Sequence, residues 1–139
     1  MIRYILDTDH LSLLQRGHEP LRQYLATTPP DQIAITIISA EELIRGRLAQ
    51  ISRAQTAQTR QRAYFWFQET LDFLSDFALI PYDAKADQRF LNFRSQKIRI
   101  GTQDLRIAAI VINYKATLIT RNYRDFEQVP HLKIEDWSS

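Results

Sequence analysis

The sequence predicts an α/β fold, a three-layer α/β/α sandwich around a small, mostly parallel sheet. Short apolar, β-branched runs alternate along the chain with longer stretches of helical spacing. The run over 33–38 is almost continuously apolar, which is typical of a strand covered on both faces, as in parallel sheets. Strands that alternate with helices are joined by crossovers and therefore favour parallel pairing.

The first third of the chain contains two predicted strands and a helical region. Residues 2–6 predict the first strand, and residues 33–38 predict the second. Between them, leucines recur at helical spacing over 11–26, and Gly17 is expected to break this helix. Ser39 is expected to cap the next helix, with Glu42 in its first turn, where negative charge suits the helix dipole.

Beyond residue 60 the chain predicts an amphipathic helix and then further alternation. Tyr64, Phe67, Leu71 and Leu74 form an apolar stripe at helical spacing. Such a stripe is more often a core or a partner face than a cofactor site, and we expect this one to pack in the core. The remaining elements are a strand over 78–81, a helix over 84–98, a helix over 105–114 that Asp104 opens, a strand over 116–120, a turn into a short helix over 122–126 and an edge strand over 132–134.

Composition places the chain among compact globular proteins. At 139 residues, 45% hydrophobic and 24% charged, it has the size of a single domain spanning residues 1–139. It has no cysteine, which excludes disulfides, zinc–thiolate sites and cysteine nucleophiles. No signal peptide and no apolar run of membrane-spanning length is apparent, so we expect a soluble, cytoplasmic protein.

The net charge of +2 is small, so the local distribution of charge matters more than the total. Five arginines and no acid occur over 43–68, and a second basic stretch runs over 89–106. Such segments could contact the phosphates of a polyanion, or they could be solvated helix faces. The arginines that we regard as candidates for contacting such a polyanion are Arg45, Arg47, Arg99, Arg106 and Arg121.

Four acidic residues fall at predicted junctions between strands and helices. Asp7 ends the first strand, Glu42 begins the helix after the second, and Asp104 and Asp125 flank the fourth. An aspartate is costly to bury unpaired, so Asp7 is either a cap or one part of a charged site. Because ligands of open α/β sheets bind beyond the carboxyl ends of the strands, the four carboxylates can converge on one rim.

Converging carboxylates repel one another and favour protonation, and a divalent cation removes this conflict. Ligation by oxygen alone suits Mg²⁺ or Mn²⁺. The scattered His10, His18 and His131 argue against zinc and are expected to be surface or packing residues. A Mg²⁺ ion held by acids can activate water against a phosphodiester, which the arginines would attract. Each acid alone could be an ordinary cap or helix-start residue, so the prediction depends on their joint placement.

Five segments, in order along nearly the whole chain, resemble the PIN-domain family, specifically the VapC-like ribonuclease toxins of toxin–antitoxin pairs. They read YILDTDHLSLL, ISAEELIRG, IGTQDLRIAAI, LITRNYRDF and IEDW. The resemblance implies a PIN-like α/β/α sandwich and a Mg²⁺- or Mn²⁺-dependent endoribonuclease. It places the family's metal-binding acids on Asp7, Glu42 and Asp104.

The fourth acidic position of the family is less direct in this sequence. The residue after Thr-Arg is often acidic, but here it is Asn122, so that either Asp125 takes this place or Asn122 binds a metal-bound water or a phosphate. Thr8 and Thr120 are expected to support the site through polar contacts. Asp9 stands where asparagine is common, and it either adds charge near the metal or acts as an inert cap.

The resemblance also implies partners. VapC-like toxins pair with a small antitoxin that blocks the acidic groove, and homodimers are common among them. Three other readings remain open: a receiver-type phosphoacceptor domain, a PIN fold that binds RNA or protein without cleaving it, and a DNA-cleaving nuclease. The receiver reading needs a lysine after the last strand, whereas Lys133 does not come after the strand expected over 132–134.

Overall fold

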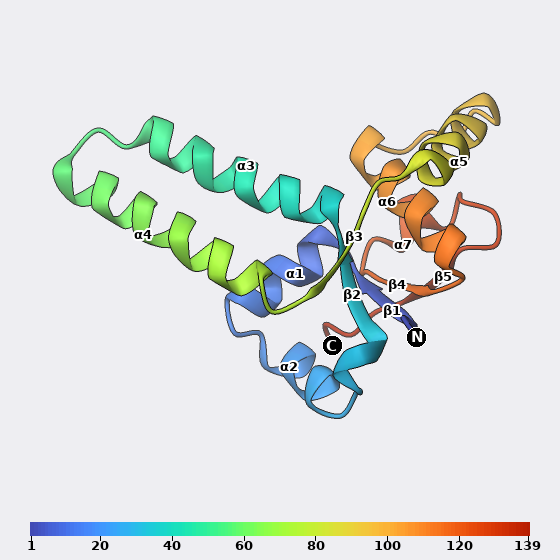
Figure 1. The fold of residues 1–139 in the computed structure, drawn as a ribbon, viewed down its shortest axis with the longest axis horizontal. Coiled ribbons are helices and arrows are strands. Elements are labelled where there is room, and N and C mark those ends of the chain that lie inside the picture. Colours follow the sequence, from blue (N-terminus) through green and yellow to red (C-terminus); the bar gives the residue numbers. More distant parts are fainter.

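The computed structural model describes residues 1–139 and contains one five-stranded, entirely parallel sheet of order β3-β2-β1-β4-β5 (Figure 1). The strands are β1 (Tyr4–Leu6), β2 (Ile33–Thr36), β3 (Ala78–Ile80), β4 (Thr117–Ile119) and β5 (Lys133–Glu135). The helices are α1 (Thr8–Gln15), α2 (Glu19–Ala26), α3 (Ile37–Arg53), α4 (Ala57–Leu74), α5 (Ala84–Ser95), α6 (Thr102–Tyr114) and α7 (Tyr123–Phe126). A 3₁₀ turn, Pro30–Gln32, precedes β2.

Helices cover both faces of the sheet, which confirms the predicted three-layer sandwich. Successive residues of a strand point to opposite faces, and both faces are apolar here. Ile5 packs in the cluster that includes the inner sides of α5 and α6, whereas Leu6 packs in the cluster formed with α1 and α2. The central strands therefore have no polar face, as the sequence indicated.

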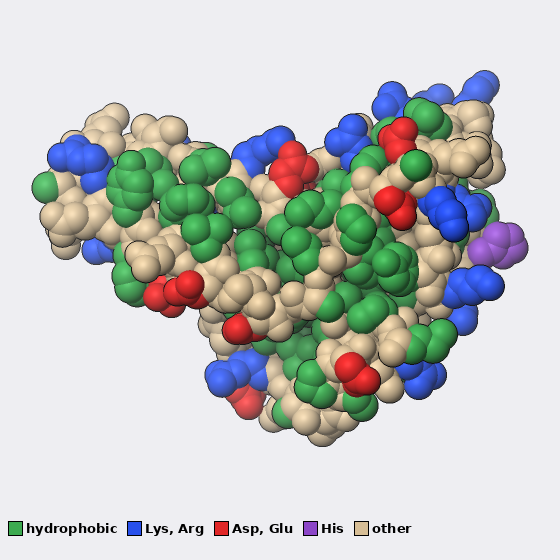
Figure 2. Space-filling view, in the orientation of Figure 1, with side chains coloured by type: hydrophobic (Ala, Val, Ile, Leu, Met, Phe, Trp, Pro, Cys, Tyr) green, Lys and Arg blue, Asp and Glu red, His purple; other side chains and the backbone are tan.

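The helix pair α3 and α4 projects from the sheet as a hairpin (Figure 1). The prediction that the α4 stripe packs in the core is wrong for its outer part, because Tyr64 and Leu71 are exposed, and so are the neighbouring Phe65 and Trp66. Only the end of α4 nearest the sheet joins the core, through Leu74. Figure 2 shows hydrophobic side chains gathered along this projecting arm.

Two local features set where the helices begin and end. Gly17 separates α1 from α2 and has φ +81°, a left-handed conformation that favours glycine. The expected cap at Ser39 is wrong, because the Thr36 side chain accepts a hydrogen bond from the Ser39 N–H at 3.1 Å and thereby caps α3. The helix therefore starts at Ile37, in residues that look like a strand, and Glu42 lies beyond the first turn.

None of the helices combines the length and the apolar composition needed to cross a membrane.

Replacing Thr36 with valine should lower the free energy of unfolding by about 1–2 kcal/mol, because the buried cap of α3 is lost while the side-chain shape is kept. Chemical denaturation measures this loss. Thr102→Val, at an exposed first position of α6, is the matched control and should change stability by less than about 0.5 kcal/mol. Equal stabilities of the two variants would contradict the assigned cap.

Candidate functional site

An acidic cleft lies where the order of the strands reverses. From β1 the chain passes outward to β2 and β3, whereas β4 and β5 lie on the other side of β1. Crossovers that diverge in this way leave a crevice at the carboxyl ends of the central strands. A cleft of about 760 Å³ occurs there, lined by Asp7, Thr8, Asp9, Ser12, Glu42, Leu43, Asp104, Arg121, Asn122 and Phe126.

Asp7 serves both of the roles that its position in the sequence allowed. It directly follows β1 and caps α1, since its Oδ1 accepts a hydrogen bond from the His10 N–H at 2.7 Å. The residue also lines the cleft, although it is only 6% exposed. A carboxylate at a helix N-terminus is stabilised by the helix dipole, which offsets part of the cost of its burial.

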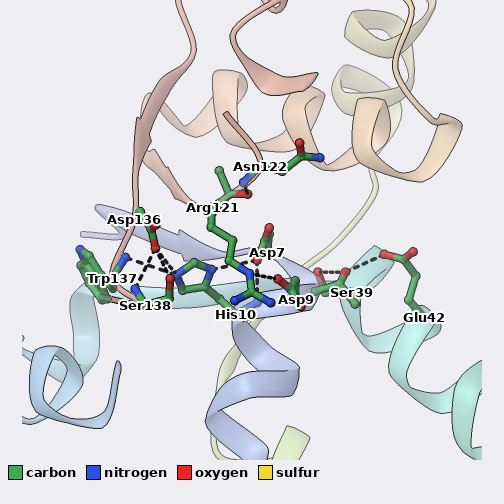
Figure 3. A network of polar contacts seen from close by, with 12 residues as sticks. Asp7, Asp9, His10, Ser39, Glu42, Arg121, Asn122, Asp136, Trp137 and Ser138 are labelled. Carbon is green, nitrogen blue, oxygen red and sulfur yellow. Dashed lines mark hydrogen bonds and ion pairs between the residues drawn. The ribbon is translucent and has the colours of Figure 1, made fainter. Parts of the chain in front are cut away.

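Glu42 enters the cleft from α3 and is held by a hydroxyl from α1. Thr8 Oγ1 donates to Glu42 Oε1 at 2.6 Å and lies 3.0 Å from Ser39 Oγ (Figure 3). These contacts join the first turn of α1 to the first two turns of α3, and the two helices follow adjacent strands. Thr8 therefore supports Glu42 through a polar contact, as the resemblance implied.

Asp104 provides the clearest sign that the carboxylates share one electrostatic environment. It lies in the first turn of α6, and its pKa is raised from 3.8 to about 6. Burial is the largest cause, followed by the charges of Glu42, Asp7 and Asp125. The other three predicted acids therefore all act on Asp104, although they come from distant parts of the sequence.

Asn122 and Asp125 form one unit beside the cleft. Asn122 caps α7, and its Nδ2 donates to Asp125 Oδ2 at 3.1 Å. The fully buried Thr120 accepts a hydrogen bond from the Asn122 N–H at 3.0 Å and so holds the turn after β4. Asn122 lines the cleft, whereas Asp125 does not line it but acts on Asp104 by its charge.

Asp9 is paired with a cation at the edge of the cleft. Arg121 Nε donates to Asp9 Oδ2 at 2.7 Å, and the two side chains are 50% and 46% exposed. An ion pair so exposed contributes little to stability and can exchange partners. Asp9 thus adds a charge that Arg121 largely neutralises.

Arg121 is the only candidate arginine that lines the cleft. Arg45 pairs with Glu41 on α3, and Arg99 is exposed. Arg47 donates to Thr70 at 2.9 Å and lies over the Trp66 ring within the projecting arm. The remaining guanidinium, that of Arg106, stacks 5.2 Å from the centroid of the Phe90 ring and is part of the packing between α5 and α6.

The donor set suits a hard divalent cation, because every acidic ligand offers carboxylate oxygen. As the side chains stand, however, no three histidine, aspartate or glutamate residues are arranged to hold a single metal ion. Thr8 restrains Glu42 and Asn122 restrains Asp125, while mutual repulsion opposes closer approach. The carboxylate side chains must therefore rotate before they can bind one cation together.

Two residues near the site were not expected from the sequence. Ser39 links the Thr36 cap to Thr8, and His10, regarded as a surface or packing residue, is fully buried with Nδ1 3.3 Å from Asp7 Oδ1. The predicted helix began at Leu11, whereas α1 begins at Thr8. This earlier start would have placed His10 one turn after Asp7 and so indicated the second contact.

Comparison with known proteins agrees with this geometry. The sequence profile of the PIN domain matches residues 4–132, which include all four acids. The chain belongs to the PIN domain family. Two relatives of this PIN domain are named as ribonucleases. Ribonuclease VapC of Rickettsia bellii is 28% identical to this chain, and the match covers 94% of this chain and 92% of the relative. Ribonuclease VapC1 of Haemophilus influenzae strain R2866 is 25% identical, and the match covers 97% of this chain and 98% of the relative.

Solved structures extend the similarity to the whole PIN domain. A chain of the VapBC2 complex from Rickettsia felis, bound to a DNA fragment from their promoter, is 29% identical, with a TM-score of 0.77 over 99% of both chains. A chain of a toxin–antitoxin complex from Klebsiella pneumoniae is 28% identical, with a TM-score of 0.70 over 93% of this chain and 94% of that one.

Asp104→Asn should stabilise the metal-free protein at pH 7.5 by about 1 kcal/mol, a value reduced for the partial exposure of the side chain. Between about pH 4 and pH 6 the folded protein keeps a proton that the unfolded chain has lost, so the stability of the unmodified protein falls as pH rises through this window. Urea denaturation at pH 4 and pH 7.5 measures the difference.

At pH 4 the Asp104→Asn substitution should add little to the free energy of unfolding, since the Asp104 carboxyl group is then largely neutral in the folded protein. Asp31→Asn removes an exposed carboxylate and serves as the control, with little change expected at either pH. An Asp104→Asn variant no more stable than the unmodified protein at pH 7.5 would contradict the assigned repulsion.

Proposed function

We propose that this protein is an endoribonuclease that requires Mg²⁺ or Mn²⁺ and acts as the toxin of a VapBC-type toxin–antitoxin pair. The observation that carries the proposal is that Asp7, Glu42 and Asp104 line one cleft, where burial and the charges of Glu42, Asp7 and Asp125 raise the pKa of Asp104 to about 6. Its relatives named Ribonuclease VapC support the choice of reaction.

In this proposal Asp7, Glu42, Asp104 and Asp125 hold the cation. When bound, the ion activates water and neutralises charge on the phosphodiester. The carboxylates alone would repel RNA, so phosphate enters only when their charge is balanced. Hydrolysis adds water across one P–O bond, leaving a phosphate on one end of the chain and a hydroxyl on the other.

Residues around the acids prepare the cleft for this reaction. Thr8 keeps Glu42 turned toward α1, and Thr120 keeps Asn122 at the cleft wall. Arg121 can leave Asp9 and donate to a phosphate oxygen of the substrate, because the pair is half exposed. The other candidate arginines lie farther from the cleft, and we propose Arg45 and Arg99 as contacts for more distant phosphates of a long RNA.

The fourth acidic role is assigned to Asp125 acting with Asn122. The amide of Asn122 holds Asp125 Oδ2, while Asn122 itself lines the cleft. Asp125 then supplies negative charge, and Asn122 supplies a polar contact to a metal-bound water or a phosphate. Asp9 stays with Arg121 outside this set.

Partners follow from the same similarity. The relatives from Rickettsia felis and Klebsiella pneumoniae were solved as toxin–antitoxin complexes, which supports a small antitoxin as the partner of this chain. We propose the exposed aromatic face of α4 as a protein contact, either for the antitoxin or in a homodimer. Light scattering of the purified chain should give twice the mass of one chain, and a monomeric mass would rule out the homodimer.

The purified, antitoxin-free protein should cut total cellular RNA into discrete fragments with Mg²⁺ or Mn²⁺, and EDTA should abolish cleavage. Asp104→Asn should lower the rate by about 100-fold or more, because charge that stabilises the transition state is lost. Asp125→Asn should lower it less, and Asp31→Asn should leave it unchanged. Sequencing the new RNA ends checks each result.

DNA of the same sequence should remain intact, since RNA differs in its 2′-hydroxyl groups and A-form shape. Cleavage of DNA at the same rate would favour a general nuclease. A protein that binds Mn²⁺ but cuts no RNA would leave only a binding function for this PIN domain, and cleavage that persists in Asp104→Asn would rule out the acidic cleft as the active site.

A further inference from the structure

We propose that His10 is a positioning residue whose imidazole Nδ1 faces the Asp7 carboxylate and orients it for the cleft. The ring is itself held by the segment Asp136–Ser138, from the other end of the sequence. The inference deepens the proposed function and rests on it, because Asp7 matters for catalysis only if the acidic cleft is the active site.

The geometry around His10 connects the cleft with this segment. The residue lies on α1 and is fully buried. Its Nδ1 lies 3.3 Å from Asp7 Oδ1 and makes no hydrogen bond as the side chains stand. Its Nε2 accepts a hydrogen bond from the Trp137 N–H at 3.3 Å (Figure 3). One imidazole ring therefore touches a cleft carboxylate on one side and a distant backbone amide on the other.

The Trp137 contact decides which ring nitrogen carries the proton. The Trp137 N–H and the Asp136 carboxylate both face Nε2, but only the N–H makes a hydrogen bond with it. A backbone N–H can only donate, so Nε2 presents its lone pair, and in a neutral ring the proton then lies on Nδ1. A protonated ring would also carry a proton on Nδ1. The nitrogen that faces Asp7 is thus a donor in both forms, and a buried carboxylate is a strong acceptor.

The segment that holds the ring is firmly packed. Trp137 is 2% exposed, and its ring stacks on that of Tyr24 at a centroid distance of 5.1 Å. Asp136 Oδ1 lies 3.4 Å from His10 Nε2 and accepts from the Ser138 N–H at 2.8 Å and from its hydroxyl at 2.6 Å. Burial raises the pKa of Asp136, but the Ser138 hydrogen bonds, His10 and Arg121 together lower it.

These contacts constrain Asp7 at one oxygen. Oδ1 accepts the His10 N–H at 2.7 Å and faces the His10 ring, both groups belonging to one residue. Oδ2 is left as the oxygen that can bind a cation in the cleft. Donors behind a metal-binding side chain orient it, and their loss typically costs about 10- to 100-fold in metal affinity or activity.

Two substitutions at His10 separate positioning from packing. His10→Asn puts an amide donor near the position of Nδ1, whereas His10→Leu removes the donor and keeps an apolar side chain. Leu13→Ala, on the same helix and in the same core but without contact to Asp7, controls for lost stability alone. For each protein we would measure the Mn²⁺ dissociation constant, kcat and KM for RNA cleavage, and the melting temperature.

His10→Leu should weaken Mn²⁺ binding and lower kcat by about 10- to 100-fold with little change in KM. His10→Asn should keep most of the Mn²⁺ affinity and most of the kcat of the unmodified protein. Leu13→Ala should lower the melting temperature and leave Mn²⁺ binding unchanged. If His10→Leu binds Mn²⁺ as tightly as the unmodified protein, or if Leu13→Ala weakens binding equally, the positioning role is overturned and His10 is only a packing residue.

An NMR measurement on the metal-free protein needs neither Mn²⁺ nor RNA. A correlation spectrum of the ¹⁵N-labelled imidazole should show a proton on Nδ1 of His10, and the Asp7 carboxyl ¹³C signal should move in His10→Leu more than in His10→Asn. A proton on Nε2 alone overturns the proposal. If RNA is not cut but these signals and Mn²⁺ binding behave as expected, the proposed nuclease function fails while the contact between His10 and Asp7 stands.

Discussion

Repulsion among the carboxylates at the end of a parallel sheet is the constraint on which the functional part of this structure depends. β1 lies at the centre of the sheet, and the chain diverges on either side of it, so residues that follow the strands meet in one cleft. Burial and three neighbouring negative charges raise the pKa of Asp104 to about 6. The fold thus stores an electrostatic cost that a bound cation would remove.

The surrounding polar residues keep this cost from disrupting the fold. Thr8 donates a hydrogen bond to Glu42, and Asn122 donates one to Asp125. Two of the four carboxylates are therefore stabilised by a polar side chain nearby. Asp7 is stabilised as the cap of α1. Each contact also restrains the acid that it stabilises, which explains why no three acids are arranged around one ion in the metal-free protein. Stability without metal and readiness for metal therefore oppose each other at this site.

In the α3–α4 arm, the prediction of a helix is confirmed, but the predicted burial of its apolar face is not. The apolar spacing of α4 predicted a helix, and the helix forms, but Tyr64 and Leu71 remain exposed because the hairpin extends beyond the sheet. Periodicity reports that one face of a helix prefers apolar contact and says nothing of which molecule provides it. The exposed face of α4 is the surface that we propose above as a protein contact.

The sequence by itself determined the three layers, the five strands in their order along the chain and the set of acids at strand–helix junctions. These features depend on local patterns: apolar runs, helical spacing, and polar residues that end a strand. The start of α3 was not predicted because Ile37 and Ile38 are β-branched and continue the apolar pattern of the strand. One hydrogen bond, from the Ser39 N–H to the Thr36 side chain, starts the helix there instead. Only the tertiary structure decided that Arg121 faces Asp9 and that Trp137 reaches His10, since these contacts join residues more than 100 positions apart and depend on how the sheet and helices pack.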